Sequence, residues 1–242
     1  MNKTGILLLP GGGMSSWIWK KLVPLLENNV VCPDYRIGEN SLESRMNSSI
    51  QDCLEYLLSL SAAFESVIVV AHSGSGLIAA SLARKNPKKI AGVIYISSNI
   101  PKNHTSAIES LPYFVRQMNV FAIKSQVKKE SLPLSGKASM VRKIFCNTCD
   151  DATIEFVLRQ RLLSEPLCMA FEKVNWDNFP QLSQKYIILT NDKTHSVKHQ
   201  KQMMENLQIT DSVFVDSDHM VMLSHPEQLA KIIIEFQNSL QS

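Results

Sequence analysis

The chain lacks any long run of apolar residues. None of its 242 residues lies in a segment that approaches the ~18–20 apolar residues of a membrane-spanning helix, so the sequence predicts no membrane protein. The first apolar run, residues 6–9, is too short for the core of a signal peptide, and Pro10 and three glycines follow it, which favours a first strand. The net charge of +3 at pH 7 is too small to argue for a nucleic-acid partner.

Cysteine is also scarce, with five residues that are irregularly spaced and odd in number. Cys146 and Cys149 form a CxxC pair, but no second pair lies at the spacing of a zinc site. We interpret them as ordinary reduced thiols, with metal or redox use as the alternative. The glycine-rich residues 11–13 match neither GxGxxG nor GxxxxGKS/T, which disfavours nucleotide binding. Together these absences predict a cytoplasmic protein without a cofactor or a metal ion.

What the sequence does contain is a regular alternation of short apolar runs and helix-length segments. The runs are continuously apolar, as in strands that are covered on both faces, and parallel sheets are covered in this way. The alternation predicts an α/β fold with a doubly wound sheet of about six mostly parallel strands, flanked by helices. We expect strands at residues 6–9, 30–32, 67–71, 92–97, 186–190 and 212–215, and helices at residues 16–27, 47–62, 76–85, 196–207 and 226–239.

Residues 101–180 interrupt this alternation. They show no strong strand pattern, and Pro112 and Pro133 interrupt their helical patterns. An insertion of this size between two strands of an α/β sheet is usually a helical cap over the active site. We therefore expect a cap of residues 101–180 after the fourth strand, with helices near residues 114–123, 138–144 and 151–163, on a core of residues 1–100 and 181–242.

The expected cap is basic up to residue 143. A solvated surface is one interpretation of these charges. The alternative is a docking face for an acidic substrate, or for an acidic partner such as an acyl carrier protein. The cations are Lys102, Arg116, Lys124, Lys128, Lys129, Lys137, Arg142 and Lys143, and they stand against Glu109 and Glu130.

The most informative motif is residues 71–76, Ala-His-Ser-Gly-Ser-Gly. It follows an apolar run and opens a helix-like stretch, and strand, tight turn and helix are the context of a nucleophile elbow. Small residues are needed two positions before and after the serine, because strand and helix pack closely there. Ala71 and Ser75 take these places, where glycine is usual. The motif predicts Ser73 as a nucleophile, with a serine-glycine turn without chemistry as the alternative.

A serine hydroxyl needs a base to take its proton and a third group to orient that base. His219 lies in a polar loop just past the last expected strand, and Asp192 directly follows the fifth. Both come after Ser73 in the order serine, acid, histidine of α/β-hydrolases. Asp192 could also be an ordinary turn aspartate. The other candidates are less well placed: His72, His104, His195, His199 and His225 as base, and Asp34 and Asp218 as acid.

An oxyanion hole requires two backbone N–H groups that point at the developing negative charge. One normally comes from the residue after the nucleophile, which is Gly74. The other comes from the loop after the first strand, where residues 11–13 are all glycine. We expect Gly12 to be that second donor.

With these segments in place, the chain resembles the α/β-hydrolase superfamily, and within it the branch of plant methylesterases, hydroxynitrile lyases and small bacterial esterases. The resemblance implies that Ser73 is the nucleophile, His219 the base and Asp192 the orienting acid. It implies Gly12 and Gly74 as the oxyanion donors. The similar segments are residues 8–19, 34–38, 96–101, 145–166, 190–193 and 218–223, of which the last is the most specific.

Departures from that branch bear on the loop and on the substrate. Pro10 and Met14 replace two usual histidines, so the hydrogen bonding of the loop must differ. In the hydroxynitrile lyases a threonine stands at the place of Gly11 and a lysine at the place of Met220. A glycine leaves room for a carbonyl group, and a methionine offers no charge to a cyanide leaving group. The resemblance therefore favours ester hydrolysis, with Gly11, Met14 and Met220 as candidate pocket residues.

The sequence thus predicts a serine hydrolase that cleaves a small, largely apolar carboxylic ester, with methyl esters among the candidates. An acyl-enzyme on Ser73 would be the intermediate, and no cofactor would be needed. Two alternatives stay open. One is a lyase, cyclase or acyltransferase that uses the same three residues, and the other is a ligand-binding receptor of the same fold.

Overall fold

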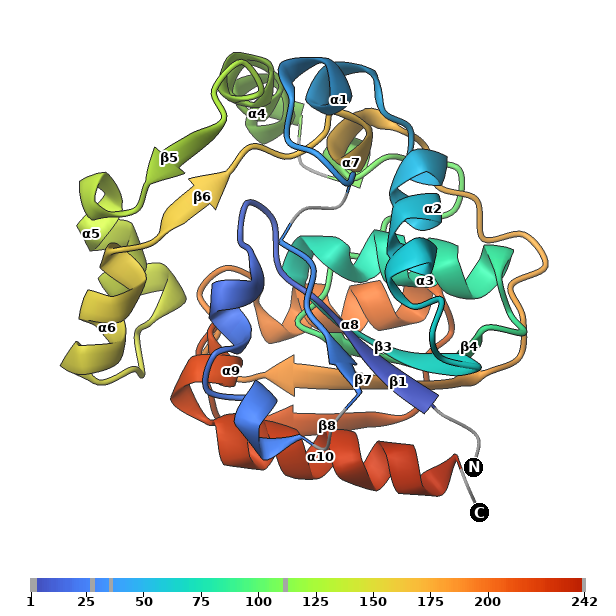
Figure 1. The fold of residues 1–242 in the computed structure, drawn as a ribbon. Helices are drawn as coiled ribbons and strands as arrows, with labels where there is room; N and C mark the ends of the chain where they lie inside the picture. Colours follow the sequence, from blue (N-terminus) through green and yellow to red (C-terminus); the bar gives the residue numbers. More distant parts are fainter. Residues whose placement is uncertain (1–3, 27–28, 35–36, 111–112, 241–242) are drawn as a thin grey trace.

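The computed structural model describes residues 4–26, 29–34, 37–110 and 113–240. Its centre is a sheet of six parallel strands in the order β2-β1-β3-β4-β7-β8 (Figure 1). All six expected strands are present, and β1, β3 and β4 are buried along most of their length, as strands covered on both faces should be. The strands are β1 (Thr4–Leu9), β2 (Val30–Val31), β3 (Ser66–His72), β4 (Ile90–Ile96), β7 (Ser183–Leu189) and β8 (Ser212–Val215).

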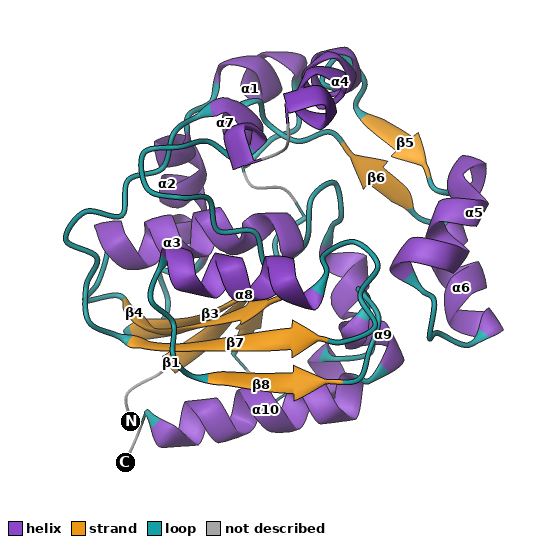
Figure 2. Cartoon of the chain, turned by 180° about the vertical axis from the view of Figure 1, so that it is seen from behind, coloured by secondary structure: helices purple, strands orange, loops and turns teal. Residues whose placement is uncertain are grey.

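Helices cover both faces of this sheet, as predicted. α2, α3 and α8 lie over one face and α10 under the other (Figure 2). Two expected helices have the predicted ends, and two are slightly shorter. A capping box of Ser49 and Asp52 begins α2, and the Ser196 side chain caps α8. The helices are α2 (Ile50–Leu60), α3 (Gly76–Lys85), α8 (Val197–Asn206), the short α9 (Val221–Ser224) and α10 (Pro226–Ser239).

The helix expected at residues 16–27 was wrong. Two short 3₁₀ helices stand there, η1 (Ser16–Trp19) and η2 (Val23–Leu25), and the last expected residue lies outside the described chain. Pro24 lacks an N–H donor, so a continuous helix could not satisfy its hydrogen bonds at this point. Conversely, α1 (Leu42–Asn47) was not expected, although the Ser41 side chain caps it.

Residues 97–182, between β4 and β7, form the insertion, and its segments α4 to α6 extend beyond the sheet (Figure 1). The insertion is not purely helical, because it contains an antiparallel pair of strands, β5 (Ser131–Pro133) and β6 (Arg161–Leu163). The helix expected at residues 151–163 therefore ends early, since its last residues pair with β5. The helical segments are η4 (Ile108–Ser110), α4 (Tyr113–Gln126), η5 (Ser135–Lys137), α5 (Ala138–Met140), the π-helical η6 (Val141–Phe145), α6 (Asp151–Leu158) and α7 (Cys168–Phe171).

The division into a core and a separate cap at residues 101 and 180 stays a prediction. Among the described helices, none has the length and apolar character needed to span a bilayer.

The strand register places one end of each strand at a common edge. Leu9 aligns with Ala71, His72 with Ile96, and Leu189 with Val215. The connections of β1 and β3 leave in opposite directions, because β2 lies on one side of β1 and β4 on the far side of β3. Such a switch point at the carboxyl edge is where open α/β sheets bind ligands. The loops after β1, β3, β4, β7 and β8 all begin at this edge.

Candidate active site

The chain makes a strained turn between β3 and α3, as the elbow motif predicts. Ser73 directly follows β3 and has a φ of 51°, in the left-handed region that costs a residue other than glycine about 1–3 kcal/mol. Its carbonyl oxygen accepts a hydrogen bond from the Asn99 N–H at 2.8 Å. A Cβ on Gly76 would lie 2.6 Å from the Asn99 oxygen, so this position requires glycine. Ser75 donates from Oγ to the Pro10 oxygen and so ties the elbow to the loop after β1.

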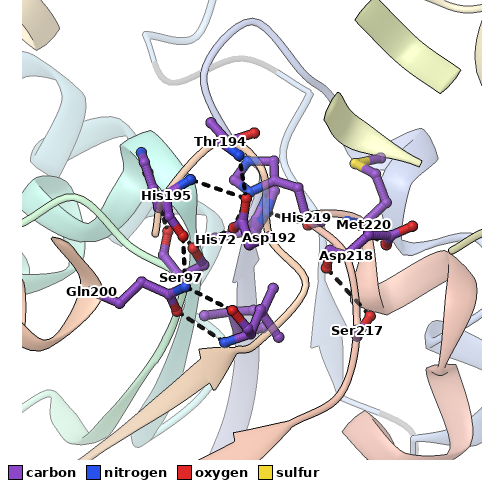
Figure 3. A network of polar contacts seen from close by, with 12 residues as sticks. His72, Ser97, Asp192, Thr194, His195, Gln200, Ser217, Asp218, His219 and Met220 are labelled. Carbon is purple, nitrogen blue, oxygen red and sulfur yellow. Dashed lines mark hydrogen bonds and ion pairs between the residues drawn. The ribbon is translucent and has the colours of Figure 1, made fainter. Parts of the chain in front are cut away.

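Asp192 lies in the loop after β7, where four donors surround its carboxylate (Figure 3). Oδ2 accepts from His219 Nδ1 at 2.7 Å and from Ser97 Oγ at 2.6 Å. Oδ1 accepts from the backbone N–H groups of Thr194 at 2.6 Å and His195 at 3.0 Å. Burial alone would raise the pKa of Asp192, but the hydrogen bonds and charge of its neighbours lower that pKa well below its usual value. The carboxylate is therefore ionised at neutral pH.

His219 lies in the loop after β8 and is almost completely buried. Its Nδ1 donates to Asp192, which leaves Nε2 as the ring nitrogen that can accept a proton. The ring of Phe145, from the insertion, stacks on it with centroids 5.8 Å apart. On another side the His72 ring lies 4.5 Å away, and His72 Nε2 is 2.9 Å from the His219 carbonyl oxygen. The imidazole is thus fixed by the hydrogen bond of its Nδ1 and by the rings that pack on it.

The loop after β1 brings Gly12 against the elbow. A Cβ on Gly74 would lie 3.3 Å from the Gly12 nitrogen, so the backbones of the two expected oxyanion donors are neighbours. The insertion holds the next residue of this loop from the outside. The Gly13 N–H donates to Glu165 Oε1 at 2.6 Å, and the Gly13 oxygen accepts from the Leu163 N–H at 2.6 Å. This loop, in which Pro10 and Met14 replace two usual histidines, is thus held by hydrogen bonds from the insertion.

Close packing gives a second reason for a glycine at position 11, besides the room for a carbonyl group that the sequence suggested. A Cβ at this position would lie 2.7 Å from His72 Nδ1 and 3.1 Å from the Ser73 Cβ. The close approach of loop and elbow therefore requires glycine. A threonine, as in the lyases of the resembling branch, would not fit in this arrangement.

The sequence did not predict the roles of three residues around the site. Ser97 follows β4 directly and has a φ of 40°, so its position at a strand end was a usable signal. His195 was considered as a base, but it lies beside Asp192 and donates from Nδ1 to the Ser97 oxygen at 2.8 Å. Glu165 had no local signal, because it reaches Gly13 across 152 positions of sequence.

Burial keeps two further histidines of this region neutral. It lowers the pKa of His195 to about 4, with the nearby His219 as the next cause. It also lowers the pKa of His72 well below the usual value, again with His219 as the second cause. Both imidazole rings are therefore uncharged neighbours of His219 at neutral pH.

Asp192, His195 and His219 also lie at a spacing that could hold a metal ion, since one ligand atom of each is within 4.8 Å of the others. The two Nδ1 atoms, however, are already bonded to Asp192 and to the Ser97 oxygen. A metal at this spot would have to replace those hydrogen bonds. We therefore interpret the three residues as a hydrogen-bonded network.

The remaining sequence candidates lie apart from this network or serve other contacts. His104 is exposed and pairs with Asp177 at 3.2 Å, and Asp34 accepts from Ser16 on an exposed part of the surface. Asp218 is buried and accepts from the Thr148 N–H at 2.8 Å, which ties the insertion to the loop of His219. Met14 and Met220 are buried in the same hydrophobic cluster, and their role in a pocket stays a prediction.

A cavity of 240 Å³ opens beside the two glycines at this edge. Its walls are largely apolar and come from α3 and from the insertion, with Leu77, Ile108, Ile123 and Met169 among them. A larger cleft of 470 Å³ is lined by Phe179 and by other residues that come just before β7 and β8 in the sequence. It therefore lies at the other end of the sheet. Of these two, the smaller cavity adjoins the elbow.

Comparison with known proteins supports the fold described above. The model of the alpha/beta hydrolase family matches residues 6–232. The chain belongs to the alpha/beta hydrolase family. Relatives with similar sequences are polyneuridine aldehyde esterase of Rauvolfia serpentina (25% identity, 96% of this chain and 95% of the relative), norfluorocurarine synthase 1 of Strychnos sp (26%, 97% and 95%) and methylesterase 7 of Arabidopsis thaliana (22%, 97% and 96%).

Among solved structures, an extracellular alpha/beta-hydrolase from a Paenibacillus species is similar in fold, with a TM-score of 0.77 at 17% identity over 96% of this chain and 98% of the other. This alpha/beta hydrolase therefore has the predicted fold, and the predicted resemblance to the plant methylesterase branch is confirmed. Relatives named as esterases support the expected enzyme class, a carboxylic ester hydrolase.

Proposed function

We propose that the protein hydrolyses carboxylic esters with Ser73 as nucleophile, His219 as base and Asp192 as orienting acid. The observation that carries this proposal is the 2.7 Å hydrogen bond from His219 Nδ1 to the buried Asp192 carboxylate, at the same sheet edge as the strained Ser73. Three loops that are far apart in the sequence bring these residues to one edge. Their chain order is also that of α/β-hydrolases.

The chemistry follows from this arrangement. His219 Nε2 takes the proton of Ser73 as Oγ attacks the ester carbonyl, and the protonated ring then passes that proton to the leaving alcohol. Asp192 holds the ring in the required tautomer and stabilises its charged form. The N–H groups of Gly12 and Gly74 stabilise the oxyanion of each tetrahedral intermediate. Water then attacks the acyl-enzyme, with His219 as base, and releases the acid and free Ser73.

The cavity beside Gly12 and Gly74 points to the substrate class. Its largely apolar wall and its volume of 240 Å³ suit a small, largely apolar ester without a charged group. Methyl esters are the simplest members of this class. The relatives named as esterases and as a methylesterase favour the same chemistry.

The decisive experiment is hydrolysis of p-nitrophenyl esters from acetate to octanoate by the wild-type protein beside Ser73→Ala. Ser59→Ala is the matched control, because Ser59 is exposed on α2. We expect wild-type and control activity to be equal and Ser73→Ala to lose at least about a thousandfold in kcat. Full activity of Ser73→Ala, with its fold intact by circular dichroism, would refute the proposal.

A second possibility is a lyase, cyclase or acyltransferase that uses the same three residues. The observation in its favour is that one relative is named as a synthase. A ligand-binding receptor of the same fold is the third. Product analysis with an added acceptor alcohol would reveal acyl transfer. Tight ligand binding with negligible turnover would instead identify a receptor.

For the basic surface of the insertion we keep docking of an acidic carrier protein as a proposal. Arg142 forms ion pairs with Asp151 and Glu155 at 3.2 and 2.7 Å within the insertion. Lys128 and Lys129, in contrast, are exposed just after α4. Charge reversal at these two lysines and at Lys143 should weaken turnover of carrier-bound esters and spare free ones. Equal effects on both would contradict docking.

The cytoplasmic location likewise stays a prediction, for which cell fractionation is the test.

A further inference from the structure

A second cavity adjoins the first at the loop after β1. It has a volume of 260 Å³, and its walls include Gly13, Val127 and Leu162. Three residues, Gly12, Ile123 and Glu165, line both cavities. The two cavities therefore share part of their walls, including the proposed oxyanion donor Gly12. We call them the helix lobe (240 Å³) and the strand lobe (260 Å³).

Apart from the three shared residues, the two lobes have different walls. The helix lobe lies between α3 and α7, with Leu77, Met169 and Ala170 in its wall. The strand lobe lies between the end of α4 and β6, with Val127 and Leu162 in its wall. Glu165 stands between them, and its bond to Gly13 fixes it there at 2.6 Å.

An ester has one group on each side of its carbonyl carbon, and the two groups diverge from the oxyanion hole. We propose that one lobe takes the acyl group and the other the alcohol group, so that the preferred substrate is an ester with a sizeable apolar group on both sides. This inference rests on the proposed ester hydrolysis. A methyl group, comparable in volume to the roughly 30 Å³ of a water molecule, would leave most of one lobe unfilled.

The test uses three series of unactivated esters whose acid release is followed by titration. The first lengthens the acyl group of methyl esters, the second lengthens the alcohol of acetates, and the third lengthens both. Each buried methylene should raise kcat/KM by up to about fourfold until its lobe is full. We expect gains on both sides, with hexyl hexanoate above methyl hexanoate and above hexyl acetate.

Two variants assign the sides. Ala170→Trp narrows the helix lobe and Leu162→Trp narrows the strand lobe. Each should lose the preference for long chains on one side of the ester only, and the two variants should affect opposite sides. Leu42→Trp, at an exposed leucine on α1, is the matched control and should leave all three profiles unchanged.

The possible outcomes separate this inference from the proposed function. If wild-type kcat/KM rises on one side only, or if both tryptophan variants affect the same side, the two-lobe site is wrong although the protein is an esterase. If wild type hydrolyses none of these esters and no p-nitrophenyl ester, the proposed function falls and the inference with it. The wild-type series alone decides the question if a tryptophan variant fails to fold.

Discussion

The Glu165 carboxylate accepts a hydrogen bond from the Gly13 N–H at 2.6 Å, so a side chain of the insertion holds the loop that carries the proposed oxyanion donor. The Leu163 N–H bonds to the Gly13 oxygen at the same distance. The peptide groups on both sides of Gly13 are therefore fixed from outside the sheet. Since an oxyanion hole works only when its donors are oriented beforehand, we expect the insertion to affect the proposed chemistry through this loop.

Replacement of Glu165 should therefore reduce kcat more than it changes KM. We expect Glu165→Ala to lose about tenfold in kcat, less than the 10²–10³ typical of losing an oxyanion donor itself. Glu165→Gln should restore most of this loss, because its amide oxygen can still accept from Gly13. Steady-state kinetics on a small ester measure the effect, with the exposed Glu130→Ala as control. Equal losses in the glutamine and alanine variants would contradict a positioning role.

Asp192→Asn should abolish most activity and keep the fold. An amide can present its NH₂ group to His219 Nδ1 and so favour the wrong tautomer, which in a serine protease costs about 10⁴ in kcat. We expect a loss of about 10³–10⁴ at neutral pH for this protein. Asp211→Asn, which removes only an exposed ion pair with Lys185, should retain activity. Retention of more than a tenth of the activity in Asp192→Asn would argue against the proposed acid.

Gly11 and Gly12 offer a matched pair of substitutions in one loop. A Cβ at Gly11 would meet His72 and Ser73 at 2.7 and 3.1 Å, whereas a Cβ at Gly12 would meet nothing within 4 Å. We expect Gly11→Ala to destabilise the protein by about 1–3 kcal/mol and Gly12→Ala to have little effect on folding. Urea unfolding of both variants measures this difference. Equal stability of the two would show that the loop can move away from the elbow.

His195 should make the folded state sensitive to mild acid. Its pKa is about 4 in the folded protein, below the ordinary value of 6.5, so only the unfolded chain binds the proton between these values. Stability due to this residue is therefore present above pH 6.5 and is lost as the pH falls toward 4, by about 1–3 kcal/mol. His195→Gln removes the titrating group and should flatten this dependence.

The measurement is the urea midpoint of wild type and His195→Gln at pH 7 and pH 4.5. His72 also has a lowered pKa, but burial is its largest cause and is common to both proteins. His199, whose ring is 5.0 Å from that of His195, could add to the effect, so His199→Gln is the control. Parallel pH profiles of wild type and His195→Gln would contradict the prediction.

The sequence by itself predicted the six strands and singled out the three residues of the proposed triad. Each of these leaves a local signal: a short apolar run, and a polar or small residue where that run ends. Ser73, Asp192 and His219 follow β3, β7 and β8 at or near their ends, and parallel strands bring those ends to one edge. Local pattern and global fold agree here, which is why these predictions were possible.

The tertiary structure alone decided what surrounds those residues. The bond of Glu165 to Gly13 and the pairing of β5 with β6 join segments that are distant in sequence, and their patterns carry no sign of the partner. The same holds for the two lobes at Gly12, whose walls come from α3, α4, α7 and β6. Burial and contact depend on how the insertion lies over the sheet edge, and no local propensity encodes that placement. The sequence could thus place the candidate reacting groups at one sheet edge, whereas it could not predict the shape of the cavities beside them.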